Sequence, residues 1–254
     1  MSQLRSQATL RRPSPIFLGI LAVFVGSGLL LWYEIGPPGL AAFGFVLGGW
    51  LVSLCLHEYA HAATAYHSGD HSVVEKGYLT LNPLKYSHVL LSIVLPLVFV
   101  LLGGIGLPGG AVYINPHALR NRVRESLVSA AGPLTNVLFA LLVAAAIGAS
   151  LDGTHLAFWA AAAFLGTLQV MASVLNLVPI PGLDGYGIAE PWLPEAWVVN
   201  GRKVAPFGML LLFALLWEPN IAGPFFTGIY WLVSALGIPL ELVGAGSELF
   251  RFWL

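Results

Sequence analysis

Charged residues are scarce in this sequence: Asp, Glu, Lys and Arg make up 9% of its 254 residues, against about 25% in soluble domains. Hydrophobic residues make up 57%, and this composition excludes an ordinary soluble protein and predicts one that crosses a membrane several times. The net charge of −1 argues against a nucleic-acid partner. The single cysteine, Cys55, excludes an internal disulfide.

Long apolar runs account for most of the chain. Hydropathy marks segments that are bounded by polar loops or by turns rich in Gly and Pro. These segments are 16–35, 40–66, 89–107, 125–149, 155–179, 204–217 and 225–243. We expect an all-α polytopic membrane protein with about six transmembrane helices, in which residues 1–254 form one membrane domain. The first run lacks a convincing cleavage site, so we expect a retained span and not a signal peptide.

The distribution of arginine predicts the topology. Residues 1–14 carry three arginines and no acid, so we expect a cytoplasmic tail there. If every apolar segment crossed the membrane, the arginines within 120–124 would lie on the opposite side. We therefore expect 89–107 to be re-entrant, without a net crossing, and 109–116 to return as a short β-like element. Irregular backbone at such a depth is tolerated where it is buried or lines a wet cavity.

Two histidines and a carboxylate interrupt the apolar run at 40–66. His57 and His61 are four residues apart, so a helix places both imidazoles on one face, one turn apart. This spacing suits two nitrogen ligands of a single Zn²⁺, and Glu58 could take a proton from a water at the metal's open position. His-Glu-x-x-His is typical of zinc hydrolases. The alternative is a chance match with histidines at a membrane interface.

A catalytic zinc usually takes three protein ligands. Asp184 is a candidate because residues 156–183 carry no charge before it, and because a Pro- and Gly-rich stretch around it would end the helix and present the side chain. The alternative is an ordinary aspartate in a turn. The other candidates are His67, His71, His88, His117 and His155.

Two asparagines lie inside apolar spans, Asn136 and Asn176. Amides in such positions commonly hydrogen-bond between membrane helices. Asn176 could instead face the zinc, where its N–H group would stabilise the oxyanion of a tetrahedral intermediate. The sequence leaves both interpretations open.

The combination of motifs resembles the site-2 protease family of intramembrane zinc metalloproteases, in its compact bacterial branch without PDZ or CBS domains. The similarity covers residues 40–187. The matching stretches are His57-Glu58-Tyr59-Ala60-His61, Leu81-Asn82-Pro83, Ala111-Val112-Tyr113-Ile114-Asn115-Pro116, Ala131-Gly132-Pro133 with Asn136, and Asn176-x-x-Pro179-x-Pro181-x-Leu183-Asp184-Gly185. Tyr86 and His88 depart from the pattern of that branch, which puts an accessory role of their loop in doubt.

The resemblance implies one Zn²⁺ held by His57, His61 and Asp184, with Glu58 as general base and Asn176 as an orienting or oxyanion-binding residue. It also implies a catalytic core at 40–187, followed by C-terminal helices at 204–243. We expect cleavage of peptide bonds in or near the transmembrane helices of single-span substrates in the cell membrane.

The active site is expected toward the cytoplasm, and regulation would come from a prior cleavage or an unknown partner. The alternatives are a membrane protein that binds or transports metal and a catalytically silent relative. An extended edge at 110–114 could pair with the unwound substrate.

Overall fold

The computed structural model describes residues 12–86, 98, 112–150 and 153–254. Within these ranges the regular structure is helical and no strand is assigned. The α-helices are α2 (Pro15–Trp32), α3 (Pro38–Ser68), α4 (Ser72–Glu75), α6 (Arg122–Ser150), α7 (Leu156–Leu177), α8 (Asp184–Ala189), α9 (Glu195–Val204), α10 (Gly208–Trp217), α11 (Pro219–Ala235) and α12 (Leu240–Phe250). Short 3-10 turns connect several of them. The all-α polytopic prediction is confirmed.

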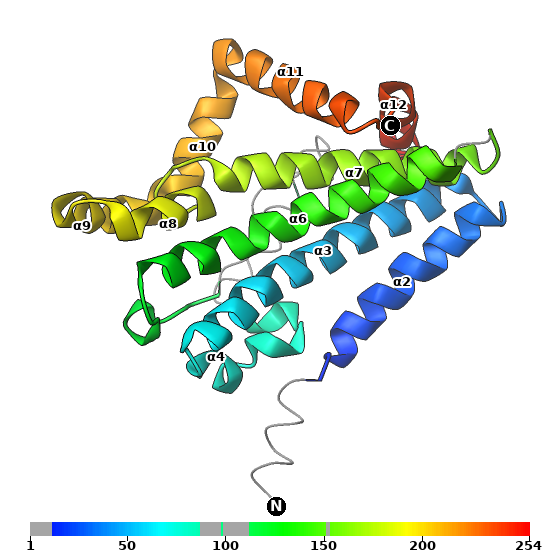
Figure 1. Cartoon of the computed structure of the whole chain (residues 1–254). Coiled ribbons are helices and arrows are strands. Elements are labelled where there is room, and N and C mark those ends of the chain that lie inside the picture. The colour runs from blue at the N-terminus through cyan, green and yellow to red at the C-terminus, as the bar shows by residue number, and fades with distance from the viewer. Residues whose placement is uncertain (1–11, 87–97, 99–111, 151–152) are drawn as a thin grey trace, which may run out of the picture.

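Helices α3, α6 and α7 run side by side and form the core of the molecule (Figure 1). α2 packs against α3, and α12 packs against α7. Small residues permit these close approaches: a Cβ at Gly49 of α3 would collide with Phe24 and Leu165, and one at Gly246 of α12 would overlap the backbone oxygen of Ala160. Membrane helices associate largely through such close packing, because moving an apolar side chain from lipid to a helix interface provides no hydrophobic driving force.

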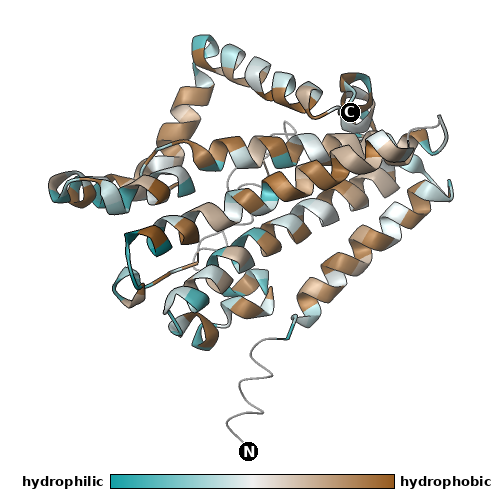
Figure 2. Ribbon diagram, viewed as in Figure 1, coloured by the Kyte–Doolittle hydropathy of each residue, from teal (hydrophilic) through white to brown (hydrophobic). Residues whose placement is uncertain are grey.

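Within the described ranges, five helical segments are long and apolar enough to cross a membrane, and a bent pair, α11 and α12, would bring the number to six. Figure 2 shows hydrophobic colouring along most of each long helix and polar residues mainly at the ends and around α4, α8 and α9. The predicted span at 204–217 is part of a longer segment, Glu195–Trp217. The predicted last span at 225–243 differs from the structure, because the chain bends by 113° between α11 and α12. Gly237 has a φ of +82° there and Pro239 follows it, a combination that ends a helix.

The polar stretch predicted after α3 folds back against the end of that helix. Val73, Tyr78 and Leu79 are buried there together with Ala62 and Ala65 of α3. The predicted re-entrant segment at 89–107 lies outside the described residues, except for Val98. Residues 109–111 of the predicted β-like element also lie outside them.

Asp70 joins this stretch to the chain that precedes α6. Its carboxylate accepts hydrogen bonds from the backbone N–H of Asn115 (2.8 Å) and from the N–H and hydroxyl of Ser72 (3.0 and 2.7 Å). Val112 and Ile114 pack against the cluster around Ala62. Residues 112–115 are therefore held beside the C-terminal half of α3, which also carries the two histidines.

Candidate metal centre

α3 supplies three of the predicted site residues, His57, Glu58 and His61, and all three are buried. The helix runs unbroken to Ser68 and stops at Gly69, whose φ of +126° suits glycine. At 1.5 Å per residue, His57 lies about 16 Å from this end of the helix. The polar cluster therefore lies within the C-terminal half of α3 and not in its last turn.

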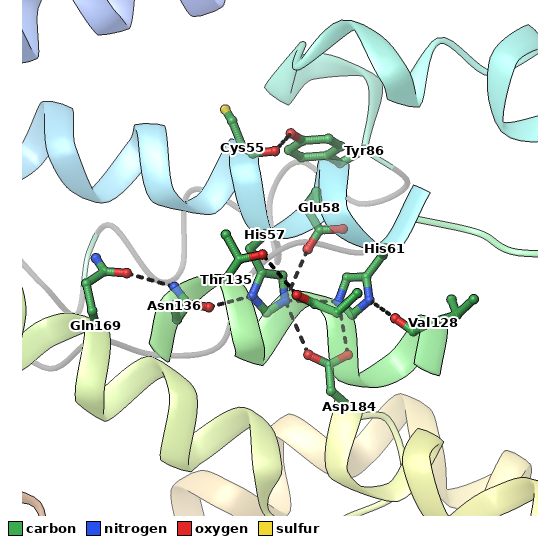
Figure 3. A network of polar contacts seen from close by, with 11 residues as sticks. Cys55, His57, Glu58, His61, Tyr86, Val128, Thr135, Asn136, Gln169 and Asp184 are labelled. Atoms are coloured by element: carbon green, nitrogen blue, oxygen red, sulfur yellow. Dashed lines mark hydrogen bonds and ion pairs between the residues drawn. The ribbon is translucent and has the colours of Figure 1, made fainter. Parts of the chain in front are cut away.

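Asp184 reaches the two histidines from the far end of α7. That helix stops at Leu177, and the following turn, in which Gly182 has a φ of +99°, leads into α8, which begins with Asp184. The carboxylate oxygens lie 3.2 Å from Nε2 of His57 and 3.3 Å from Nε2 of His61, and the two Nε2 atoms are 3.1 Å apart (Figure 3). One ligand atom from each of the three residues falls within a radius that a single metal ion can bridge.

One stripe of α6 covers the histidines from the other side. Val128, Gly132 and Asn136 are spaced by four residues and lie on the same face of the helix. The carbonyl of Val128 lies 2.6 Å from Nδ1 of His61, and Oδ1 of Asn136 lies 2.6 Å from Nδ1 of His57. Both imidazoles are held through Nδ1, so both Nε2 atoms point toward the shared position, as in the outer shell of many metal sites.

The residues present fit a zinc ion. A Cβ added at Gly132 would overlap Nε2 of both His57 and His61, so glycine at this position preserves room between the ligands. Two nitrogens and a carboxylate are a usual donor set for a catalytic zinc. Oε2 of Glu58 is buried and has no hydrogen-bond partner in the described part of the chain, and Oδ2 of Asp184, also buried, faces Nε2 of His57 at 3.2 Å. A metal ion and an attacking water would satisfy oxygens placed in this way.

The two intramembrane asparagines have different surroundings. The predicted interhelical hydrogen bond is present at Asn136, whose Nδ2 donates to Oε1 of Gln169 in α7 at 2.8 Å. Sequence reasoning missed its contact with His57, although the four-residue spacing from Gly132 was a usable signal. Asn176 is buried and lines a small pocket with Trp50, His57 and Asn136. Its oxyanion role stays a prediction.

The remaining candidate ligands that the structure describes do not join this group. His155 stacks on Trp32 with ring centroids 3.9 Å apart, and His67 and His71 contact the ring of Tyr66. The hydroxyl of Tyr86 donates to the carbonyl of Cys55 at 3.3 Å. His88 lies outside the described residues.

Comparison with known proteins finds close relatives along nearly the whole chain. This chain is 49% identical to "Putative zinc metalloprotease Rip2" of Mycolicibacterium smegmatis and 48% identical to the protein of the same name from Mycobacterium tuberculosis. Both alignments cover 95% of this chain and 95% of the relative. It is 28% identical to "Putative zinc metalloprotease YwhC" of Bacillus subtilis over 66% of this chain and 78% of that protein. No family model and no solved structure matches.

Proposed function

Because the chain belongs to the site-2 protease family of zinc metalloproteases, we propose that it hydrolyses peptide bonds within or beside the transmembrane helices of other membrane proteins. It is a membrane zinc metalloprotease, and the finer proposal is the intramembrane substrate. The observation that carries the proposal is the convergence of His57, His61 and Asp184 beside Glu58, with His57 about 16 Å along the axis of α3 from its end.

We assign His57, His61 and Asp184 as the zinc ligands and Glu58 as the general base. When bound, zinc would polarise the scissile carbonyl and lower the pKa of the attacking water. Glu58 is buried, and its Oε1 lies 3.9 Å from Nε2 of His57. Its carboxylate takes one proton from the attacking water and delivers it to the amine nitrogen that leaves when the peptide bond breaks. Asn176, in the neighbouring pocket, is the proposed oxyanion donor.

A substrate helix must unwind before it can be cut, because its carbonyls are engaged in i→i−4 hydrogen bonds. Gly, Pro or Asn near the cleaved bond would lower this cost. We propose single-span membrane proteins as substrates, which reach the site laterally through the bilayer. We also propose that the enzyme resides in the cell membrane with its N-terminus and its site toward the cytoplasm, where water can reach Glu58.

The chain beside Glu58 is the proposed docking edge for the unwound substrate. The backbone of Val112 hydrogen-bonds to the Glu58 carboxyl group. Tyr113 is exposed, but its N–H donates to the hydroxyl of Tyr78 (3.4 Å) and its carbonyl accepts from Nζ of Lys76 (2.8 Å). A substrate strand that pairs here would replace these two contacts. Tyr113→Pro removes an N–H of this edge and leaves the contact between Val112 and Glu58 in place. This variant should therefore cleave less without loss of zinc, and full activity would remove the docking edge from the proposal.

The test uses the purified protein with candidate single-span substrates, with and without a zinc chelator, followed by mass mapping of the products. Cleavage within or beside the apolar segment is expected, and the chelator should abolish it. Glu58→Gln is expected to retain zinc and lose cleavage by several orders of magnitude. If the Glu58→Gln variant, reconstituted into lipid vesicles, instead carries zinc across the bilayer as fast as the wild-type protein does, a transport function replaces proteolysis.

A further inference from the structure

We propose that Gln169 and Asn136 form a hydrogen-bond relay that keeps the proton of His57 on Nδ1 and so leaves Nε2 free for the metal ion. The inference rests on the proposed role of His57 as a ligand. Gln169 touches neither the metal position nor a substrate, so it is a positioning residue that acts through Asn136.

The relay joins three helices in the core. Oδ1 of Asn136 in α6 lies 2.6 Å from Nδ1 of His57 in α3, and Nδ2 of Asn136 donates to Oε1 of Gln169 in α7 at 2.8 Å (Figure 3). His57 and Asn136 are each 3% exposed, and Gln169 is fully buried. A buried amide is costly unless it is hydrogen-bonded, and Nε2 of Gln169 has no hydrogen-bond partner among the described residues. A costly group in this position indicates a role beyond packing.

His61 needs no such relay. Its Nδ1 faces the backbone carbonyl of Val128 at 2.6 Å. A carbonyl can only accept a hydrogen bond, so Nδ1 of His61 must carry the proton and Nε2 must keep its lone pair. The tautomer of this ligand is determined by the main chain of α6.

His57 faces a side-chain amide, which can present either an oxygen or an NH₂ group. With Oδ1 toward the ring, Asn136 accepts from Nδ1–H, and Nε2 is free to bind metal. With NH₂ toward the ring, Nδ1 would accept and the proton would move to Nε2, where the metal has to bind. Because Oε1 of Gln169 accepts from Nδ2 of Asn136, it holds the amide in the first orientation.

Removal of the acceptor at 169 should therefore weaken zinc binding. If Gln169→Met lets the two orientations of Asn136 become equally populated, half of the molecules hold the wrong tautomer and the zinc dissociation constant rises about twofold. Asn136→Leu removes the direct partner of His57 and should raise the constant by about 10–100-fold, the usual effect of losing such a contact.

Asn136→Asp separates the relay from a merely structural role of Gln169. A carboxylate can only accept, so it keeps the proton on Nδ1 of His57 without help from residue 169. In the Asn136→Asp background, Gln169→Met should leave the zinc constant unchanged, whereas a packing defect would weaken zinc equally in both backgrounds. This double-mutant cycle isolates the coupling between the two residues.

The experiment measures zinc affinity by competition with a chromogenic chelator, on detergent-purified protein whose fold is checked by its unfolding temperature. Ser173→Ala and Thr167→Val are matched controls in α7, because both hydroxyls bond only to the backbone of their own helix among the contacts described. They should leave the zinc constant unchanged.

An unchanged constant in Gln169→Met, or an equal loss in both backgrounds, would overturn the relay, as would a wild-type protein that binds no zinc. A wild-type protein that binds zinc but cuts no membrane substrate would contradict the proposed function alone, and the affinity cycle would still decide on the relay.

Discussion

Two apolar parts of the molecule differ sharply in what surrounds them. In the most apolar window of α7, 89% of residues are buried, whereas in Glu195–Trp217 the share is 17%. α7 contains Ala160–Ala163 and Gly166, small residues that admit neighbouring helices. The C-terminal arm, which we define as α9, α10 and α11, instead exposes large side chains such as Trp197 and Trp217.

This difference shows that hydropathy can identify a segment able to cross the membrane, but cannot say whether lipid or other helices surround it. Both regions are apolar enough for lipid, yet only the core presents surfaces that helices can occupy closely. A polar site within the bilayer is stable only where neighbouring helices supply its hydrogen bonds. A glycine-to-alanine substitution in the core should therefore change stability or zinc binding strongly, and the same substitution in the arm should change them little.

The largest effect is expected from Gly132→Ala in α6. The new methyl group would overlap Nε2 of both His57 and His61, so we expect zinc affinity to fall more than about 100-fold, the upper range for changes around a metal site. The measurement is zinc stoichiometry of the purified protein by atomic emission.

Two other glycines serve as controls for this prediction. Gly148 in α6 and Gly228 in the arm would each place a Cβ with no described heavy atom within 4 Å. Their alanine variants should bind zinc normally and gain slightly in helix stability. Full zinc occupancy in Gly132→Ala would mean that the ion does not lie between the two histidines.

A packing effect of intermediate size is expected where α12 covers the core. Gly246→Ala would drive a methyl group into the backbone oxygen of Ala160, and overpacking of this kind costs about 1–3 kcal/mol. The unfolding temperature in detergent should fall accordingly. Gly244→Ala, two residues earlier and clear of described neighbours, should leave it unchanged; equal losses in both variants would argue against this contact.

Asp70 should give a smaller effect that depends on pH. Burial raises the pKa of its carboxyl, but hydrogen bonds from Asn115 and Ser72 outweigh this, and the pKa lies below its ordinary value. The folded state therefore favours the carboxylate. The resulting stability is present above the pKa of the unfolded chain and is lost as the pH falls through the lower folded pKa.

Asp70→Asn should accordingly lower the stability by about 1 kcal/mol at pH 7, the usual contribution of such hydrogen bonds. The gap between variant and wild type should begin to narrow as the pH falls below about 4, the ordinary pKa of an aspartate, and should go on narrowing as the pH falls further. Unfolding temperatures of both proteins across this range provide the measurement, and a gap that does not change with pH would contradict the assignment to Asp70.

The smallest effect is expected at the one ion pair between fully charged side chains recorded in the described ranges, near the start of the arm. Nε of Arg202 lies 2.7 Å from Oε1 of Glu190, and the arginine side chain is 59% exposed. Exposed pairs contribute about 0–1 kcal/mol. Arg202→Gln should therefore change the unfolding temperature less than Asp70→Asn does at pH 7. A larger loss would show that the arm depends on this contact more than its exposure suggests.

Local features of this protein follow from its sequence alone. Charge-free runs long enough for a bilayer predict the helices, because backbone groups in lipid must bond within their own segment. The four-residue spacing of His57 and His61 predicts one shared face, because the period of an α-helix fixes it.

The tertiary structure decided what these features do together. Asp184 lies more than a hundred residues beyond the histidines, and His57 meets Asn136 across 79 residues. Which carbonyl or amide holds each imidazole, and why residue 132 has no side chain, depends on how α6 and α7 pack against α3. Distances between segments come from that packing, and no periodicity within a single segment encodes them.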